Sequence, residues 1–421
     1  MLVTPLSEVT VPASPERACT IMTTPEENPT SPLPILLLSA AGFTVLTTEF
    51  LIVGLLPSMA RDLQVTVSQA GLLVTLFAFT VAAAGPFLTA LFSRMERKRL
   101  FVSILVIFGL ANIVAALSPH IGVMALARFI PALALPVFWS LASETAVELT
   151  GPDRAGRAIS MISFGIVAAT VLGIPIGTLI SDAFGWRSAF IALAVLSFAK
   201  ALLLFTFLPH TKIKKTHDSM AAQMRILRDP LIIGHVLLSM LVFAGMFTAY
   251  TYLADILERL AGFDGATVGW CLMGFGGMGL IGNWLGGRLV DRNPLGATIL
   301  FCAPMALGMV VLVPIVKSYV LLTIVLACWG IAQAALFTVC HVRVMKAASG
   351  STALGASLNI SGANTGIGLG ALLGGRVIDR FGLGSAGWAS AAVVILAITV
   401  ALFLMWRIKD PALSAADCDC A

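Results

Sequence analysis

Long apolar segments, separated by short polar or basic stretches, fill most of the chain. Most are about 20 residues long, the length that an α-helix needs to cross a bilayer, whereas a membrane β-strand needs only about half as many. Twelve such segments cover approximately residues 34–57, 70–91, 100–118, 121–148, 157–180, 188–208, 230–256, 266–289, 296–316, 318–342, 353–375 and 387–407. The pattern predicts an all-α membrane protein with twelve transmembrane helices.

The longest connection between apolar segments divides the twelve into six and six. We therefore expect a six-helix bundle over residues 34–208, a cytoplasmic linker over 209–229 and a second six-helix bundle over 230–407. Residues 1–33 are rich in Pro, Thr, Ser and Glu, which predicts a disordered cytoplasmic tail, and residues 408–421 form a second cytoplasmic tail.

The two bundles also resemble each other in sequence. GTLISDAFG ends at Gly185, and GGRVIDRFG ends 197 residues later at Gly382. The basic stretch that begins at Ser93 aligns with DRNP from Asp291 at an offset of 198. Two agreeing offsets predict pseudo-symmetric halves. Parallel six-helix repeats are typical of secondary transporters that hold their substrate between the halves.

Composition excludes a soluble protein. Hydrophobic residues make up 58% of the chain and charged residues 11%, and the mean hydropathy is +0.98, whereas soluble domains carry about 25% charged residues. Most lysines and arginines fall on one alternate set of loops, which places both termini in the cytoplasm. The five scattered histidines do not form an H-E-x-x-H motif, and neither a nucleotide motif nor a metal site is indicated, so we expect no enzyme and no cofactor.

Two opposite charges lie inside apolar segments. Glu49 is about eight residues from the end of the first segment, roughly 12 Å deep, and Arg128 is at a similar depth in the fourth. An adjacent cation lowers the pKa of a carboxyl group and desolvation raises it. A carboxyl group that alternates between these environments can load and release a proton, so Glu49 and Arg128 are the predicted proton-coupling pair. A static ion pair, or a glutamate that reaches the headgroups, is the alternative.

Four stretches carry a family resemblance. They are TTEFLIVGLLP (Thr47 to Pro57), AGLLVTLFA (Ala70 to Ala78), ARFIPALALPVFWSLA (Ala127 to Ala142) and GIPIGTLISDAFGWRSAF (Gly173 to Phe190). Together they resemble the major facilitator superfamily, specifically its twelve-span drug:proton antiporters in the branch of bacterial sugar and chloramphenicol exporters. The likeness covers about residues 34–407.

The resemblance implies a proton-coupled antiporter that exports small organic molecules by alternating access. It further implies a monomer in the bacterial inner membrane with no cofactor, whose partners are a small-molecule substrate, protons and lipid. A sugar or nucleoside permease with another direction or coupling is the alternative. A non-transporting sensor on the same scaffold is a third hypothesis.

Two gating motifs of that family have counterparts here. The antiporter motif of the fifth span matches Gly165, Gly173, Pro175 and Gly177, and the resemblance implies a pliable seam between the halves. The loop motif G-x-x-x-D-R-x-G-R-R is degraded in its first copy, which keeps Arg94, Arg97 and Lys98 but has Ser93 in place of the acid. The second copy keeps Gly287, Asp291 and Arg292. Ordinary helix packing and a purely topological basic loop are the respective alternatives.

The substrate cavity is predicted from polar and aromatic residues in the spans that the family places around it. The candidates are Asn112, Phe138, Trp139, Phe247, Tyr250, Tyr252, Gln333, Asn359 and Asn364. Aromatic faces with a few amides suit a neutral, partly apolar solute. Lys200 lies in the sixth span, away from the expected cavity, so we expect it to snorkel or to have a structural partner. Glu144 is expected to pair with a loop arginine such as Arg154.

Overall fold

The computed structural model describes residues 33–92, 94–150, 155–209, 229–348 and 352–409. The two predicted tails and most of the predicted linker lie outside these residues, so those assignments stay predictions. All regular elements in the described part are helices, and the helices belong to one contact unit.

The first six predicted spans correspond to eight helical elements. These are α1 (Leu33–Asp62), α2 (Val67–Phe92), α3 (Arg97–Ala116), α4 (Ile121–Thr150), α5 (Ala155–Ala168), the π-helical turn η2 (Ala169–Gly173), α6 (Ile174–Phe184) and α7 (Trp186–Phe207). The fifth span is divided because Pro175 has no N–H to offer the carbonyl of Val171, which lies four residues earlier. The π-helical turn absorbs this break in the hydrogen-bond ladder.

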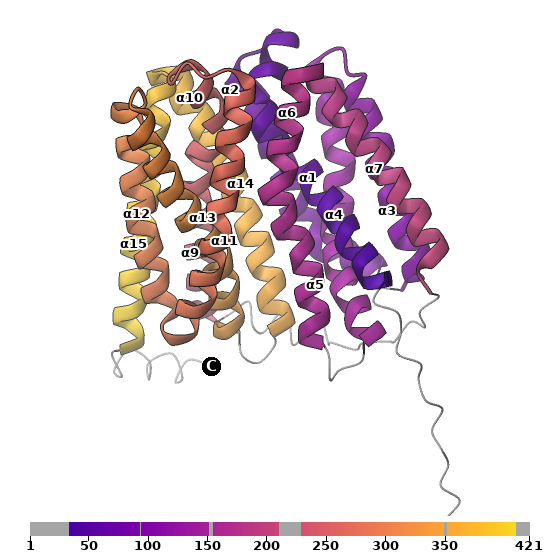
Figure 1. Cartoon of the computed structure of the whole chain (residues 1–421). Helices are drawn as coiled ribbons and strands as arrows, with labels where there is room; N and C mark the ends of the chain where they lie inside the picture. Colours follow the sequence, from indigo (N-terminus) through magenta and orange to yellow (C-terminus); the bar gives the residue numbers. More distant parts are fainter. Residues whose placement is uncertain (1–32, 93, 151–154, 210–228, 349–351, 410–421) are drawn as a thin grey trace, which may run out of the picture. The chain divides into compact units, whose positions relative to one another are not determined.

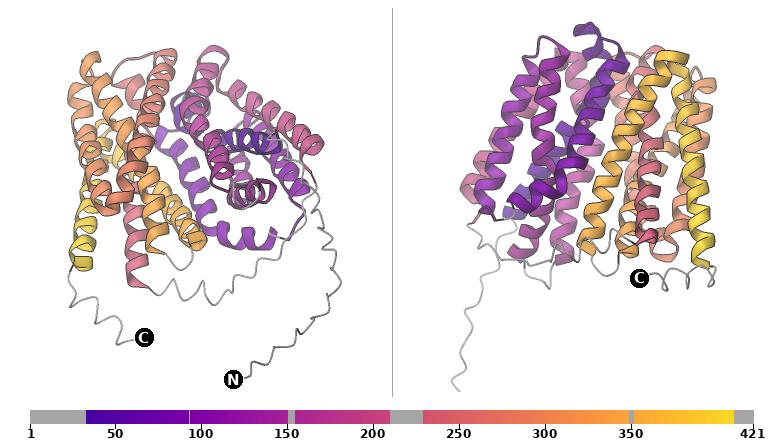
Figure 2. Two further views of the ribbon diagram at one scale, coloured as in Figure 1. Left: turned by 60° about the horizontal axis from the view of Figure 1, so that its bottom comes forward. Right: turned by 180° about the vertical axis from the view of Figure 1, so that it is seen from behind.

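The last six spans follow the same alternation. They are α9 (Pro230–Tyr250) with α10 (Leu253–Arg259), α11 (Gly265–Arg292), α12 (Pro294–Ile315), α13 (Tyr319–Ala347), α14 (Thr352–Phe381) and, after the 3-10 turn η3 (Leu383–Ser385), α15 (Ala386–Lys409). The two sets of helices lie side by side (Figures 1 and 2). Short connections make successive spans antiparallel. We call the two ends of the bundle the Leu33 end, where α1 begins, and the Asp62 end, where α1 finishes.

Eleven spans in the described part are long and apolar enough to cross a membrane, so the count of twelve is not reached by that criterion. The predicted span 353–375 is helical, but it belongs to α14, which is not among the eleven. Glycines and the amides of Asn359 and Asn364 lower the hydropathy of α14. This helix packs mainly against α9 and α2, so protein rather than lipid covers much of it.

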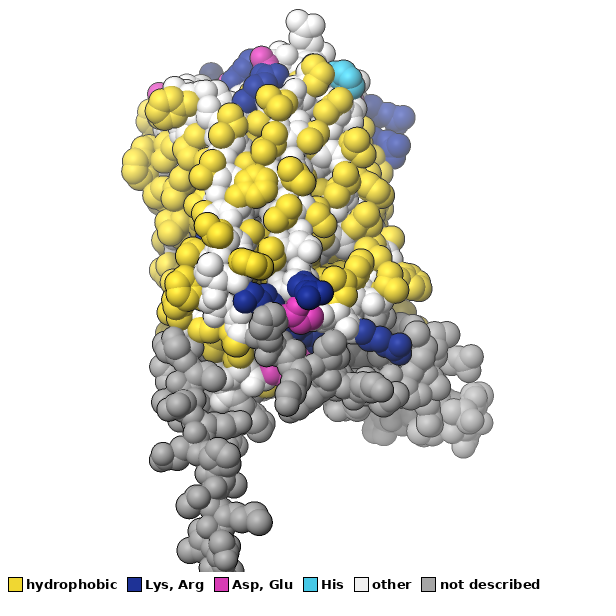
Figure 3. Space-filling model, turned by 90° about the vertical axis from the view of Figure 1, so that its right-hand side faces the viewer, with side chains coloured by type: hydrophobic (Ala, Val, Ile, Leu, Met, Phe, Trp, Pro, Cys, Tyr) yellow, Lys and Arg dark blue, Asp and Glu magenta, His cyan; other side chains and the backbone are white. Residues whose placement is uncertain are grey.

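Lipid-facing surface is visible on the side formed by α3 and α7. Figure 3 shows a continuous band of hydrophobic side chains on this face, with charged side chains above and below it. Leu110, Val195, Leu202 and Phe205 are each more than half exposed. Exposed apolar side chains between two charged margins are expected where a protein meets the bilayer core.

The sequence repeat reappears as equivalent contacts between the halves. At the end of α6, Asp182 lies against Gly265, so closely that a Cβ on this glycine would overlap the carboxylate. At the end of α14, Asp379 accepts a hydrogen bond from Ser68 at 2.9 Å. Each aspartate therefore meets the first turn of a helix from the other half. The offset of 197 residues applies to both partners of the contact.

Other contacts between the halves lie between the Asp62 end and the middle of the bundle. Arg61 forms an ion pair with Glu258. The hydroxyl of Thr75 donates to the carbonyl of Gly368 at 3.2 Å. These contacts join α1 to α10 and α2 to α14, and they bring the halves together on this side.

Candidate functional site

The charged pair predicted in the first half meets through the main chain. Arg128 is 1% exposed on α4, and its guanidinium donates to the carbonyl oxygens of Thr48 and Glu49, the latter at 2.6 Å. The same group lies 4.3 Å from the centre of the Phe77 ring. Arg128 therefore holds α1 through backbone atoms, and a ring face supplies further electrostatic stabilisation.

The Glu49 carboxylate is left outside this arrangement. Glu49 is 8% exposed, and among the described residues it forms no ion pair within 4.0 Å and accepts no side-chain hydrogen bond. The predicted interaction thus takes a different form, because the cation is committed to the carbonyls rather than to the carboxylate. An unpaired buried carboxylate is costly when ionised, and taking up a proton removes that cost.

Polar side chains from three helices surround the same stretch of α1. Asn112 of α3 donates to the hydroxyl of Thr48 at 3.3 Å, and Lys200 of α7 donates to the hydroxyl of Thr44 at 2.9 Å. The Thr48 hydroxyl in turn donates to the carbonyl of Thr44. Asn112 is thereby placed against α1, and Lys200 has the structural partner that was predicted. We call Glu49, Thr48, Asn112 and Arg128 the Glu49 site.

Two of the predicted cavity aromatics, Phe247 and Tyr250, form one cluster between the halves with Phe50 and Phe275, which the sequence did not indicate. Phe50 of α1 lies 5.8 Å from Phe247 of α9, ring centre to ring centre. Phe247 also contacts Tyr250 at 5.5 Å, and Tyr250 stacks on Phe275 of α11 at 5.5 Å. Phe50 follows Glu49 directly in the chain. The cluster therefore begins at the Glu49 site and continues into the second half.

Two other predicted cavity residues, Phe138 and Tyr252, have further contacts of their own. Phe138 is fully buried between Phe101 and Trp139, at 5.6 and 5.5 Å. The hydroxyl of Tyr252 donates to the carbonyl of Ala371 at 2.8 Å, where α9 and α14 meet. Phe138 and Tyr252 are thus held by protein contacts, and their place in a substrate cavity stays a prediction.

The amides of the second half differ in how well they are satisfied. Gln333 accepts a hydrogen bond from the indole of Trp329 at 3.0 Å. Asn359 contacts the ring of His341 at 3.4 Å, and Asn364 donates to the carbonyl of Ile360 at 3.0 Å. The side-chain oxygens of both Asn359 and Asn364 are buried without a hydrogen-bond partner. A buried acceptor without a partner calls for an explanation, and a ligand hydroxyl would provide one.

In the first predicted gating loop, Arg97 and Lys98 have partners within their own half. Arg97 bonds Glu144 of α4 at 2.8 Å, so this glutamate has an arginine other than Arg154, which lies outside the described residues. Lys98 lies 5.4 Å from the centre of the Phe205 ring, and Arg94 is exposed.

The second gating loop also pairs internally. Asp291 binds Lys346 of α13 at 2.9 Å. Arg292 lines a cavity of about 370 Å³ together with Trp284, Leu285, Arg288 and Leu289. Gly287 has open space where a side chain would begin. The acid is thus on α11 in this half, whereas in the first half it is on α4.

The glycines of the fifth span lie against α1, while the span itself meets the other half where Val171 of η2 packs against Gly276 of α11, so the seam between the halves stays a prediction. A Cβ on Gly165 would meet the carbonyl of Ser39, one on Gly173 would meet Thr47, and one on Gly177 would meet Leu51. All three partners belong to α1 of the same half. Small residues permit close helix approach in either direction, and sequence does not say which neighbour approaches. Pro175 is buried directly after η2.

Sequence analysis missed one buried cation. The predicted apolar segment 318–342 stops one residue before Arg343, but α13 continues to Ala347 and Arg343 is 1% exposed. It donates to Ser239 at 2.8 Å and to the carbonyl of His235 at 3.3 Å, while its Nε and Nη1 have no partner. Only a helical pattern that continued past residue 342 would have indicated that Arg343 lies on a buried helix face.

Comparison with known proteins agrees with this architecture. The sequence model of the family described as Major Facilitator Superfamily matches residues 38–358 of this chain. An uncharacterized MFS-type transporter of Bacillus subtilis (strain 168), YtbD, is 34% identical over 368 residues, which cover 86% of this chain and 93% of the relative. A probable sugar efflux transporter of Pasteurella multocida (strain Pm70) is 28% identical over 374 residues, or 89% and 92% of the two chains.

A solved structure shares the fold. The inward-facing, occupied structure of a bacterial homologue of the human lysosomal transporter Spinster matches with a TM-score of 0.72 at 16% identity, covering 90% of this chain and 97% of the homologue. Fold, repeat and relatives all indicate a multi-pass membrane transporter rather than an enzyme. The chain belongs to the major facilitator superfamily.

Proposed function

We propose that this transporter is a proton-coupled antiporter that exports small organic molecules from the cytoplasm. One proton moving inward across 100 mV supplies about 2.3 kcal/mol, which supports roughly 50-fold accumulation of an uncharged solute. Glu49 is the proton carrier. Arg128 is the fixed cation beside it.

The unpaired Glu49 carboxylate carries this proposal. Because Arg128 is bound to the carbonyls of Thr48 and Glu49, it stays in place whether or not the carboxyl group is ionised. Glu49 is thus free to exchange a proton with water whenever the cavity exposes it. A direct ion pair would instead hold the carboxylate ionised.

The Phe50–Phe247 contact supports coupling between proton and substrate. Phe50 adjoins Glu49 on α1, and Phe247 lies on α9 of the other half. A shift of α1 when Glu49 is protonated therefore moves Phe50 against Phe247 and changes the packing of the aromatic cluster. The contacts between the halves toward the Asp62 end support an inward-facing state, with the basic Leu33 end and both termini in the cytoplasm.

A neutral hydroxylated solute fits the substrate side best. The amide oxygens of Asn359 and Asn364 lack partners among the described residues. Phe247 and Phe337 supply aromatic faces on α9 and α13, and α14, which carries both asparagines, packs against these two helices. A sugar-like molecule offers hydroxyl donors for the oxygens and C–H faces for the rings. The efflux relative named for sugar supports the same class.

The test uses inside-out membrane vesicles from a strain without its own efflux pumps. Arabinose, uridine, chloramphenicol and ethidium serve as probes, and a pH gradient drives uptake into the vesicles. We expect one probe to accumulate with wild type, and Glu49→Gln to reduce accumulation to equilibration while exchange of preloaded probe continues. Asp62→Asn is the matched control, because Asp62 forms its ion pair with Arg187 at the Asp62 end.

Each result decides between the hypotheses. If Glu49→Gln accumulates the probe as wild type does, Glu49 is not the proton carrier. If the probe accumulates only when the gradient is reversed, the protein is a permease for that solute with the opposite coupling. If Asp62→Asn loses accumulation as completely as Glu49→Gln, the effect is general damage.

A further inference from the structure

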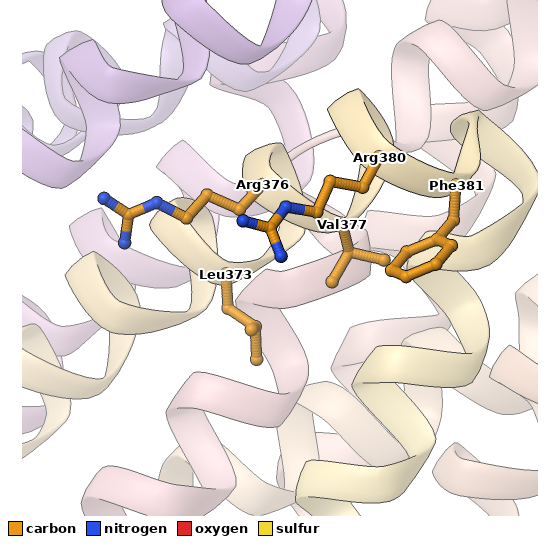
Figure 4. A pocket seen from close by; sticks show the side chains of 5 residues that line it. All are labelled: Leu373, Arg376, Val377, Arg380 and Phe381. Carbon is orange, nitrogen blue, oxygen red and sulfur yellow. The ribbon is translucent and has the colours of Figure 1, made fainter.

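Two arginines lie one turn apart where α14 reaches the Asp62 end. Arg376 and Arg380 line a cavity of about 510 Å³ together with Leu373, Val377 and Phe381 (Figure 4). Both guanidinium groups extend in the same direction, and the Phe381 ring lies on the other side of Val377. The volume falls within the range of small-molecule sites, about 300–1,000 Å³.

Neither arginine has a protein partner in the described part of the chain. The ion pairs and side-chain hydrogen bonds found there involve neither Arg376 nor Arg380. The neighbouring acid, Asp379, is engaged with Ser68 instead. Each guanidinium therefore keeps its N–H donors for a ligand.

The contacts of α14 show which way this pair faces. Gly370 and Gly374 lie against the backbone of α9, and Gly368 and Gly375 lie against α2. The remaining face carries Leu369, Leu373, Arg376 and Arg380 at helical spacing. Leu369 and Leu373 are 39% and 38% exposed. An exposed apolar stripe on a spanning helix faces lipid, and the two arginines finish that stripe.

The depth of the pair matches the lipid headgroups. Arg376 lies five residues before the end of α14, roughly 7.5 Å along the axis, and Arg380 lies at the end. Phe381, the last residue of the helix, is 75% exposed. Arginine stems near a helix end extend toward the interface and carry the guanidinium groups to the headgroups.

The first half shows that the fold does not need these cations. In the aligned repeat, Leu179 and Ala183 of α6 stand where α14 has Arg376 and Arg380. Leu179 packs onto Gly269 of α11. The basic pair is therefore an addition to one half, and a ligand explains it where helix packing does not.

We propose that Arg376 and Arg380 bind the phosphodiester of an anionic phospholipid in the leaflet at the Asp62 end. The planar guanidinium matches phosphate oxygens in pairs, which makes arginine the preferred residue for this group. An acyl chain then lies along Leu373 and Leu369. Two cations whose neighbouring acid, Asp379, is bonded to Ser68 favour a headgroup with net negative charge over a zwitterionic one.

Lipid binding to the purified full chain tests the proposal. Native mass spectrometry would compare retention of phosphatidylglycerol with that of phosphatidylcholine, and sn-glycerol 3-phosphate would serve as a soluble competitor. We expect wild type to prefer phosphatidylglycerol about tenfold, and Arg376→Gln/Arg380→Gln to lose this preference. Lys317→Gln removes another exposed cation at the same end and should retain it. The two single variants should each lose part of the preference.

Two results would overturn it. One is a preference for phosphatidylglycerol that survives in the double variant with its thermal unfolding unchanged. The other is displacement of the lipid by sn-glycerol 3-phosphate at equal concentration, because the site would then take a free anion. Neither result bears on Glu49, so the proposed transport mechanism is tested separately.

Discussion

The two halves each bury an arginine, and the surroundings of the two differ. Arg128 makes two bonds to carbonyls of α1 and lies over Phe77. Arg343 makes one close bond, to Ser239, and leaves both Nε and Nη1 unpaired among the described residues, whereas Arg128 leaves only Nε unpaired. A buried acid lies beside the first and none is described beside the second. In the proposed mechanism the first half handles the proton, while the second half supplies the aromatic and amide surface.

Removing the two arginines should have unequal effects on stability. Arg128→Met loses two charge-assisted hydrogen bonds, so we expect the free energy of unfolding to fall by about 2–3 kcal/mol. Arg343→Met loses one close bond but also removes a poorly paired buried charge, so we expect a change below about 1 kcal/mol. Thermal unfolding in detergent measures both. Equal losses would show that Arg343 is as well supported as Arg128, and the contrast between the halves would fail.

Tight packing where the halves meet predicts the next largest effect. A Cβ on Gly276 of α11 would lie 2.8 Å from the Cα of Val171 and 3.0 Å from the carbonyl of Thr170, whereas Gly277 has nothing within 4 Å. Gly276→Ala should push α11 away from η2, and it should destabilise the state in which the two are packed by about 1–3 kcal/mol.

The shift would be measured as the distance between spin labels on α6 and α11. We expect the separated population to increase at least fivefold in Gly276→Ala, and Gly277→Ala to resemble wild type. A shift in both variants would indicate that alanine disturbs α11 itself rather than its contact with the other half.

The Ser68–Asp379 bond gives a smaller effect. Ser68→Ala removes a hydrogen bond worth about 1 kcal/mol, and the equivalent contact in the other copy, Asp182 with Gly265, has no hydroxyl to lose. Label distances between α2 and α14 should lengthen in about a fivefold larger population. Ser58→Ala is the control, because Ser58 bonds only within the first half. No change in Ser68→Ala would mean that the backbone of the first turn of α2, rather than the Ser68 hydroxyl, holds the Asp379 carboxylate.

The ion pair of Arg61 with Glu258 should contribute least. Their side chains are 62% and 27% exposed, and surface pairs contribute about 0–1 kcal/mol. Glu258→Gln should therefore shift the same distances only slightly, and 0.5 M salt should abolish the difference. A large shift that persists in salt would make this pair a principal contact between the halves.

Sequence predicted the helices well because a bilayer fixes both their length and their apolarity. It also identified Glu49 and Arg128 as charges inside the bundle, since a charged residue in an apolar segment is conspicuous. It did not predict the acceptors of Arg128, because every residue carries a carbonyl and sequence does not mark the one that is used. For the same reason it did not show that the glycines of the fifth span lie against α1. Arg343 was missed because its helix extends beyond the apolar segment.

The attachment of Arg128 to the main chain has an evolutionary consequence. Carbonyl oxygens at positions 48 and 49 persist whatever side chains stand there, so no substitution of Glu49 deprives the guanidinium of its acceptors. A single nucleotide change converts a glutamate codon to glutamine. If Glu49 carries the proton as proposed, such a descendant would keep the packing of α1 and α4 while losing its energy source. Energised pumps and passive carriers can therefore be near neighbours in sequence space on this scaffold.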